Sequence, residues 1–253
     1  MSTPWYVKAF GDHYEELYAH RNDADAGRAL DFLFEQGMGP DRQKGRTLDL
    51  CCGAGRHSLA WLRAGGRSII GMDLAMNLLE SARVEVRRTG LGLHLVRGDM
   101  LRLPFQTNAF QLVLNLFTSF GYFNEESRNQ AVLHEVGRVL IEGGHFVMDH
   151  MNPVYLRATL MPESVRTTPG GIEMRETRRI LEDVSRVEKT IRFEDESGEK
   201  IEVVESVRFY EPGEIEAMAG KAGLRILERY GDFDGRGPGT DAPRAIYIMR
   251  KNG

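Results

Sequence analysis

The residues of this sequence best suited to chemistry lie in the stretch TLDLCCGAGRHS, residues 47–58. Asp49 lies within a short apolar run, two adjacent cysteines follow, and Gly53 and Gly55 precede a segment with helical spacing. Glycine at a strand end permits positive φ and lets a ligand approach the backbone, and the first N–H groups of the next helix can bind a carboxylate or a phosphate. The stretch is therefore compatible with a nucleotide-binding loop, a redox pair or a thiolate metal site.

Cys51 and Cys52 are the two cysteines of the chain. Adjacent cysteines rarely form a disulfide with each other, because the required side-chain geometry strains the backbone. The pair has neither C-x-x-C spacing nor a second group of ligands elsewhere, so the sequence favours neither a redox nor a zinc site. We expect no metal, a reducing cytoplasm as the location, and two small residues at the tip of a buried strand.

Two further acids end later apolar runs. Asp73 ends RSIIGMD, twenty residues after Gly53, and Asp99 ends LHLVRGD. The position of Asp73 suits a carboxylate that binds two ribose hydroxyls, with a helix N-cap as the alternative. Because the carboxyl ends of parallel strands meet at one edge of a sheet, the glycine loop, Asp73 and Asp99 are expected to line one crevice.

Apolar runs and helical repeats alternate along much of the chain, which predicts an α/β fold with a parallel sheet covered on both faces. The expected strands are residues 47–52, 67–73, 93–99, 110–117, 145–150, 224–230 and 244–251. The expected helices between them are residues 56–64, 74–90, 125–140 and 211–223.

The N-terminal region predicts helices. Residues 12–36 are expected to form two of them, with Asp12 and Glu15 at capping-box spacing and Asp23 as the second cap. Four aromatic residues recur every four positions, and these are Tyr6, Phe10, Tyr14 and Tyr18.

Residues 172–210 alternate with a period of two, which predicts an antiparallel insert of about three strands. Val187, Ile191 and Phe193 should share one face, as should Ile201, Val203, Val207 and Phe209. We expect a single domain over residues 1–253, with a helical cap over 1–40 and the β insert over 172–210 above the active-site edge.

The bulk properties exclude several classes. The formal net charge is −4 and the basic residues are scattered, which disfavours nucleic acid as a partner. No apolar run approaches 18 residues and the N-terminus lacks the basic start and apolar core of a signal peptide, so we expect neither a membrane span nor a signal peptide.

The motifs together carry a family resemblance. A nicotinamide site requires G-x-G-x-x-G, and Ser58 stands at the third glycine position. LDLCCGAGRHS resembles the first motif of class I S-adenosylmethionine-dependent methyltransferases, GMD at 71–73 their ribose-binding acid, and GDM at 98–100 the segment that meets adenine. FQLVLNLFTSFGYF and LHEVGRVLIEGGHFVMD resemble the fourth strand with its loop and the elements that end in the fifth strand.

The resemblance implies a Rossmann-like three-layer sandwich, with a mostly parallel seven-stranded sheet whose last strand is antiparallel. It implies S-adenosylmethionine as the cofactor, with S-adenosylhomocysteine as the product. Asp49 and the Gly53–Gly55 backbone would meet the methionine end, Asp73 the ribose, and Asp99 with Met100 the adenine. The full set of implied cofactor-binding residues is Tyr14, Tyr18, Asp49, Cys51, Gly53, Gly55, Arg56, Asp73, Leu74, Gly98, Asp99, Met100, Asn115 and Leu116.

Several of these residues have a second interpretation. Tyr14 and Tyr18 either cover the cofactor or pack in the core, and His57, next to Arg56, is expected to be exposed. His150 is the expected general base, with a structural histidine as the alternative. The acceptor pocket is expected to contain Phe117, Ser119, Phe120 and Tyr122.

The expected reaction is an in-line methyl transfer to an N or O nucleophile of a small-molecule acceptor, and an amine needs no strong base. The protein is expected to be a monomer or homodimer. The alternatives are an NAD(P)-dependent Rossmann oxidoreductase, a methyltransferase that acts on RNA or protein, and a non-catalytic S-adenosylmethionine binder.

Overall fold

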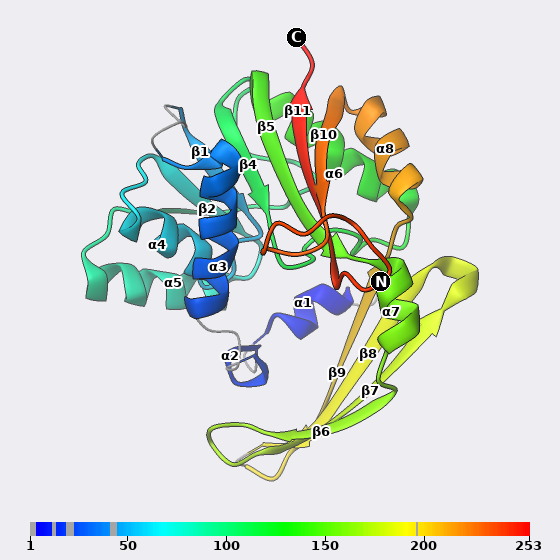
Figure 1. Ribbon diagram of the computed structural model, residues 1–253. Helices are drawn as coiled ribbons and strands as arrows, with labels where there is room; N and C mark the ends of the chain where they lie inside the picture. The colour runs from blue at the N-terminus through cyan, green and yellow to red at the C-terminus, as the bar shows by residue number, and fades with distance from the viewer. Residues whose placement is uncertain (1–3, 12–13, 19–22, 41–44, 196) are drawn as a thin grey trace.

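The computed structural model describes residues 4–11, 14–18, 23–40, 45–195 and 197–253. A seven-stranded sheet with the order β10-β11-β5-β4-β1-β2-β3 forms its centre (Figure 1). Its strands are β1 (Thr47–Leu50), β2 (Ile69–Asp73), β3 (His94–Arg97), β4 (Phe110–Asn115), β5 (Leu140–Met151), β10 (Leu224–Tyr230) and β11 (Arg244–Lys251). β11 pairs antiparallel with both of its neighbours and the other pairs are parallel, which confirms the predicted sheet.

Helices cover both faces of this sheet, as the alternating sequence pattern predicts. They are α3 (Asp23–Leu33), α4 (Arg56–Arg63), α5 (Met76–Thr89), α6 (Glu126–Val139) and α8 (Pro212–Lys221). A further short helix, α7 (Pro153–Thr159), follows β5. Leu33 of α3 and Trp61 of α4 belong to the apolar core on one face. Val136 of α6 and Ile215 of α8 belong to the core on the other. The result is the predicted three-layer α/β sandwich.

The N-terminal region contains one helix more than the prediction. The two helices predicted over 12–36 are present as α2 (Tyr14–Leu17) and α3, which a π-helical turn (Phe34–Met38) extends, and a further short helix, α1 (Trp5–Ala9), precedes them. α3 begins at the predicted residue, and Gly37 adopts φ +78°, a conformation that glycine adopts without strain. Asp12 lies outside the described residues, so its expected capping role stays a prediction.

A separate four-stranded antiparallel sheet follows α7, and α1 and α2 lie between it and the central sheet (Figure 1). Its strands are β6 (Glu163–Thr167), β7 (Glu173–Leu181), β8 (Arg186–Glu194) and β9 (Lys200–Arg208), with a 3-10 turn (Glu182–Val184) after β7. β7, β8 and β9 confirm the three strands predicted over 172–210, and β6 is an additional strand before that range. β6 is short and its side chains are exposed or half-buried, so it lacks the apolar alternation that marked the others.

The register of this sheet confirms the predicted faces. Ile191 pairs with Val203 and Phe193 with Ile201. Ile191, Phe193 and Val203 pack with Ala9 and Leu17 of the N-terminal region in one apolar cluster. The antiparallel sheet is therefore fixed to the N-terminal helices by a core of its own.

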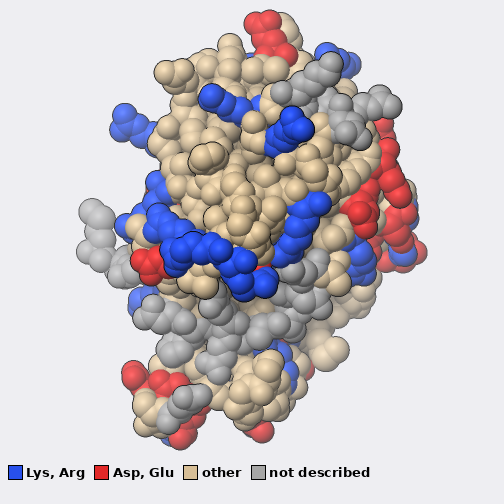
Figure 2. Space-filling view, turned by 90° about the vertical axis from the view of Figure 1, so that its left-hand side faces the viewer, with Lys and Arg blue, Asp and Glu red and all other residues tan. Residues whose placement is uncertain are grey.

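Lysine and arginine side chains gather on the face that Figure 2 shows. α5 contributes the exposed Arg83, Arg87 and Arg88. Glu85 lies between them, 2.7 Å from Arg88 and 3.3 Å from Arg63 of α4. Part of this positive charge is therefore neutralised. Within the described residues, no helix is long and apolar enough to cross a membrane.

Candidate active site

The turn between β1 and α4 is the first wall of the site. Cys51, Gly53 and Gly55 have φ of +63°, +55° and +79°, and Gly55 immediately precedes the first residue of α4. A Cβ at Gly55 would lie 3.3 Å from Leu93 and 3.4 Å from Ala82, whereas one at Gly53 would meet only Leu78 at 3.8 Å. Gly55 therefore allows close packing of α4 and α5, while Gly53 leaves open space for a ligand.

Asp49 is buried at this turn, and its carboxylate binds a proton more tightly than an exposed aspartate does. Its carboxylate accepts a hydrogen bond from the Ser58 hydroxyl at 2.6 Å. Burial raises the pKa of Asp49 to about 6, although the Ser58 hydrogen bond opposes the rise. A positively charged ligand beside it would favour the ionised form.

Asp73 connects the glycine turn to the next strand. One carboxylate oxygen accepts from the backbone N–H of Gly53 at 2.8 Å, and the other from that of Ala75 at 2.9 Å. Burial raises its pKa, and these hydrogen bonds oppose the rise. The carboxylate thus stabilises both the glycine turn and the segment before α5. Each of its oxygens keeps a second lone pair for a ligand hydroxyl.

Asp99 lies at the end of the neighbouring strand, β3. It is exposed, and its carboxylate accepts from the backbone N–H of Leu101 at 2.9 Å. Asp49, Asp73 and Asp99 all border one cavity of about 530 Å³. The predicted crevice along the carboxyl edge of β1, β2 and β3 is therefore present.

Most of the predicted site residues meet in this cavity. Its lining includes Tyr14, Tyr18, Asp49, Cys51, Gly53, Arg56, Asp73, Leu74, Gly98, Asp99, Met100, Leu116, Phe117, Ser119 and Tyr122. The two cysteines are inert here, because burial raises the pKa of both thiols. Among the described residues, no group of three or more His, Cys, Asp or Glu could hold a metal ion.

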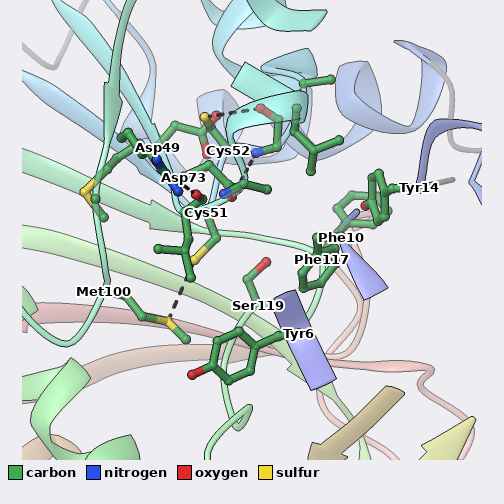
Figure 3. A pocket seen from close by; sticks show the side chains of 18 of the residues that line it. Tyr6, Phe10, Tyr14, Asp49, Cys51, Cys52, Asp73, Met100, Phe117 and Ser119 are labelled. Atoms are coloured by element: carbon green, nitrogen blue, oxygen red, sulfur yellow. Dashed lines mark hydrogen bonds between the residues drawn. The ribbon is translucent and has the colours of Figure 1, made fainter. Parts of the chain in front are cut away.

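Aromatic rings form the wall opposite the acids. Figure 3 shows Tyr6, Phe10, Tyr14 and Phe117 on the far side of the cavity from Asp49 and Asp73. The Tyr122 ring lies 6.2 Å from Tyr6 and 5.7 Å from Phe10, stacked on both, and Phe10 lies 5.2 Å from Tyr14. The cavity is thus polar toward β1–β3 and aromatic toward the N-terminal helices.

Tyr6 and Phe10 are site residues that sequence reasoning missed. Their four-residue spacing with Tyr14 and Tyr18 predicts one face of a helix. In the structure these residues do not form one continuous helix, but all four rings still line the cavity. Asn77 and Arg97 also line the cavity and were missed. Asn77 donates to the Gly11 carbonyl at 2.9 Å and Arg97 to that of Leu74 at 3.2 Å, and neither contact has a sequence signature.

Four predicted site residues do not line this cavity, and they are Gly55, Asn115, Phe120 and His150. Asn115 is buried and donates to the Leu50 carbonyl at 3.2 Å, so it joins β4 to β1. His150 is 1% exposed, packed against the rings of Phe120 and Tyr210 at 6.3 and 5.7 Å. Burial lowers its pKa to about 4. Phe120 and His150 are thus placed in the core beside the site.

His57 also departs from the prediction, because it is buried instead of exposed. Its ring lies 5.1 Å from that of Phe117, and the Arg56 guanidinium lies 3.8 Å from the Phe117 ring centre. Burial and the Arg56 charge lower the pKa of His57 well below its usual value. The imidazole therefore stays neutral in the cavity wall.

The segment after β4 is held in a strained conformation. Phe117 and Thr118 have φ of +58° and +59°, which is uncommon for residues other than glycine. The Asp149 carboxylate accepts from the Phe117 N–H at 2.8 Å, and the Asp149 carbonyl accepts from the Thr118 N–H at 3.0 Å. Arg244 of β11 lies 2.7 Å from the same carboxylate. These contacts aim Phe117 at the cavity.

Comparison with known proteins agrees with this geometry. Residues 47–144 match a family model described as a methyltransferase domain. This segment and the fold are therefore similar to those of class I S-adenosylmethionine-dependent methyltransferases. The match runs from the first residue of β1 to residue 144 within β5. It therefore includes the glycine turn, Asp73 and Asp99. The cofactor of this family is S-adenosylmethionine.

One curated relative is a demethylmenaquinone methyltransferase of Staphylococcus haemolyticus. It is 35% identical over 104 residues, which are 40% of this chain and 41% of that protein. A second, of Thermus thermophilus, is 34% identical over 50% of this chain and 53% of its own length. The chain thus spans about half the length of the curated relatives it matches.

The CcbJ methyltransferase of Streptomyces caelestis shares the fold over both whole chains, with 20% identity and a TM-score of 0.81. S-adenosylmethionine-bound CalS10, an amino pentose methyltransferase of Micromonospora echinaspora, has 20% identity, a TM-score of 0.67 and coverage of 96% of this chain and 98% of its own chain. At such identity the likeness shows the fold alone, the antiparallel sheet included.

Proposed function

We propose that this methyltransferase transfers a methyl group from S-adenosylmethionine to an N or O nucleophile of a small molecule, and that nitrogen is the favoured nucleophile. The observation that carries the proposal is the single cavity in which the Gly53 turn, Asp73 and Asp99 face an aromatic wall. When bound, S-adenosylmethionine supplies a methyl group on a positively charged sulfur, which is the electrophile of an in-line displacement.

The residues of the cavity fit the cofactor in order along the sheet edge. The Gly53 turn and the first N–H groups of α4 suit the carboxylate of the methionine part, and Asp49 suits its ammonium group. The Asp73 carboxylate has free lone pairs for the ribose hydroxyls, and Asp99 with Met100 would flank the adenine. Leu116 and Phe117 would lie toward the reacting centre.

The aromatic wall favours a nitrogen acceptor. Aromatic faces attract cations by about 0.5–2 kcal/mol, so they stabilise the positive charge that an attacking amine acquires. Among the described residues that line this wall, tyrosine is the one titratable type, and tyrosine is a weak base. A hydroxyl acceptor gives up its proton only to a strong base, whereas an ammonium ion needs only a weaker base to become a nucleophilic amine.

The small size and aromatic lining also support a metabolite rather than a polymer. A cavity of about 530 Å³ is in the usual range for small-molecule sites. The amino pentose methyltransferase shares the whole fold, which supports the same class of acceptor for this chain.

Two measurements test this function. Calorimetric titration with S-adenosylhomocysteine and, separately, with NADH should give micromolar binding of the first and none of the second. Transfer of radiolabelled methyl from S-adenosylmethionine to a panel of small amines, phenols and carboxylates should label amines. Tight NADH binding without S-adenosylhomocysteine binding would refute the proposal, and label confined to phenols would refute the choice of nitrogen.

A further inference from the structure

Tyr18 connects the cavity to the antiparallel sheet. The residue lines the cavity and is 5% exposed. Its hydroxyl donates to the carboxylate of Glu205 on β9 and accepts from the Lys189 ammonium on β8 at 3.1 Å. Lys189 and Glu205 are paired across the two strands, so the phenol oxygen lies between a cation and a carboxylate of one sheet face.

Glu205 differs from its neighbour Glu176 on this face. Arg166 and Arg178 bind Glu176, and Lys189 lies 3.4 Å from it. Although burial raises the pKa of Glu176, Arg166, Lys189 and Arg178 together lower it to about 2. Among the described residues, by contrast, no lysine, arginine or histidine forms an ion pair with Glu205, and burial raises its pKa to about 7. Glu205 is therefore able to take up a proton near neutral pH, whereas Glu176 stays ionised.

The other bases of the cavity are committed elsewhere. The carboxylates of Asp49, Asp73 and Asp99 accept from Ser58 or from backbone N–H groups on the cofactor side. His57 has too low a pKa to take a proton from an amine. On the aromatic side, the Tyr18 hydroxyl is bonded to the half-buried carboxylate of Glu205.

We propose that Tyr18 and Glu205 form the proton-accepting pair of the acceptor site, and that the acceptor is an amine that enters as an ammonium ion. The proton of the ammonium nitrogen passes to the Tyr18 oxygen while the Tyr18 proton passes to the Glu205 carboxylate. The nitrogen keeps the electron pair with which it attacks the methyl carbon. Lys189, hydrogen-bonded to the phenol oxygen, stabilises the charge during the exchange, and Glu205 returns its proton to solvent after each turnover.

The proposal rests on the function proposed above, and its test uses binding instead of turnover. The probe is cyclohexylamine, titrated by calorimetry into the full chain saturated with S-adenosylhomocysteine at pH 6 and pH 8. Because only ionised Glu205 can take the proton, affinity of the wild type should rise about tenfold between these pH values. Glu205→Gln should remove this rise and weaken binding about tenfold at pH 8. Tyr18→Phe, which keeps the ring, should have the same effect.

Two controls separate this role from a structural one. Glu202→Gln changes the same residue type at an exposed position on the other face of β9, and should behave as wild type. Cyclohexanol, which is uncharged and too weak an acid to give its proton to a carboxylate, should bind wild type and Glu205→Gln equally. Affinity for S-adenosylhomocysteine should change less than twofold in both Glu variants.

The outcomes are distinct. If the wild type does not bind S-adenosylhomocysteine, the proposed methyltransferase function is refuted. Normal S-adenosylhomocysteine binding with no cyclohexylamine binding, or with equal cyclohexylamine affinity in wild type and Glu205→Gln, would refute the proton-accepting pair. A parallel loss of S-adenosylhomocysteine and cyclohexylamine affinity in Glu205→Gln would assign Glu205 a purely structural role.

Discussion

The carboxylate of Asp149, in β5, accepts the backbone N–H of Phe117, which follows β4, at 2.8 Å. Asp149 is fully buried and also carries the ion pair with Arg244 at 2.7 Å. One side chain therefore stabilises the left-handed backbone of Phe117 and joins β11 to the site. Such strain persists only where the surrounding structure determines it.

Asp149→Asn should lower the free energy of unfolding by about 2 kcal/mol, because the amide keeps an acceptor for Phe117 but removes the charge that pairs with Arg244. Chemical denaturation measures this. Asp234→Asn provides the control, since the Asp234–Arg236 pair is half exposed and should change stability by less than about 0.5 kcal/mol. Equal stability of wild type and Asp149→Asn would contradict the assigned role.

Asp73→Ala should weaken S-adenosylhomocysteine binding about 100-fold, since hydrogen bonds to a charged group contribute about 1.5–3 kcal/mol each. The mutation also leaves the N–H groups of Gly53 and Ala75 without their acceptor, so the turn should lose some stability. Calorimetry measures the affinity, and circular dichroism checks the fold. Glu80→Ala, exposed on α5, is the matched control, and unchanged affinity in Asp73→Ala would reject the ribose assignment.

The raised pKa of Asp49 predicts a pH dependence of stability. The folded-state pKa of about 6 exceeds the ordinary value of 3.8, so the folded chain binds more protons between these values than the unfolded chain. The stability that this proton provides is complete below pH 3.8 and is lost as pH rises through 6, by about 3 kcal/mol. Thermal unfolding of wild type and Asp49→Asn at pH 5 and 8 should show that the variant gains relative stability at the higher pH. An equal difference at both pH values would refute the shift.

The same pKa predicts how cofactor affinity depends on pH. A cationic group beside Asp49 is stabilised by the ionised carboxylate, so S-adenosylhomocysteine affinity should fall as pH drops through about 6. Calorimetry between pH 5 and 8 measures the fall. Asp49→Asn should bind more weakly at pH 8 and show a flatter profile, whereas an unchanged profile would place the ligand's ammonium group elsewhere.

Arg186, in β8, should prove to be an anchor between the antiparallel sheet and the site. It is 6% exposed, and it donates to the carbonyls of Phe123 at 3.0 Å and Tyr122 at 3.2 Å and to the Ser206 hydroxyl at 2.9 Å. Arg186→Met would leave buried carbonyls unpaired, which should lower the free energy of unfolding by about 3 kcal/mol. Arg192→Met, exposed on the same strand, should cost less than about 0.5 kcal/mol in denaturant melts. Similar losses in both variants would contradict the anchor.

The central sheet could be predicted because its signals are local. Runs such as FQLVLNLF predict buried parallel strands, and the glycines after TLDLCC predict the turn between β1 and α4. Asp73 and Asp99 then follow, because strand ends in a parallel sheet share an edge. The cofactor half of the site is therefore a consequence of short sequence segments.

The acceptor half depends on contacts between distant segments. Met148 and His150 lie two residues apart in β5, so they share a face of the sheet, and that face belongs to the core behind the site. The sequence MDHMNP does not indicate which face of β5 meets the cavity. Tyr6 and Phe10 enter the wall only because the chain breaks between α1 and α2 and packs on the loop after β4.

The antiparallel sheet binds both sides of the aromatic wall. Arg186 holds the carbonyls of Tyr122 and Phe123, while Lys189 and Glu205 hold the hydroxyl of Tyr18. An engineer who replaced residues 163–208 with the corresponding segment of a relative would thus change the contacts on both sides of this wall at once. Under the proposed function, acceptor preference and folding stability depend on the same contacts, so a change of substrate by exchange of the sheet would require compensating changes at Tyr18 and in the loop after β4.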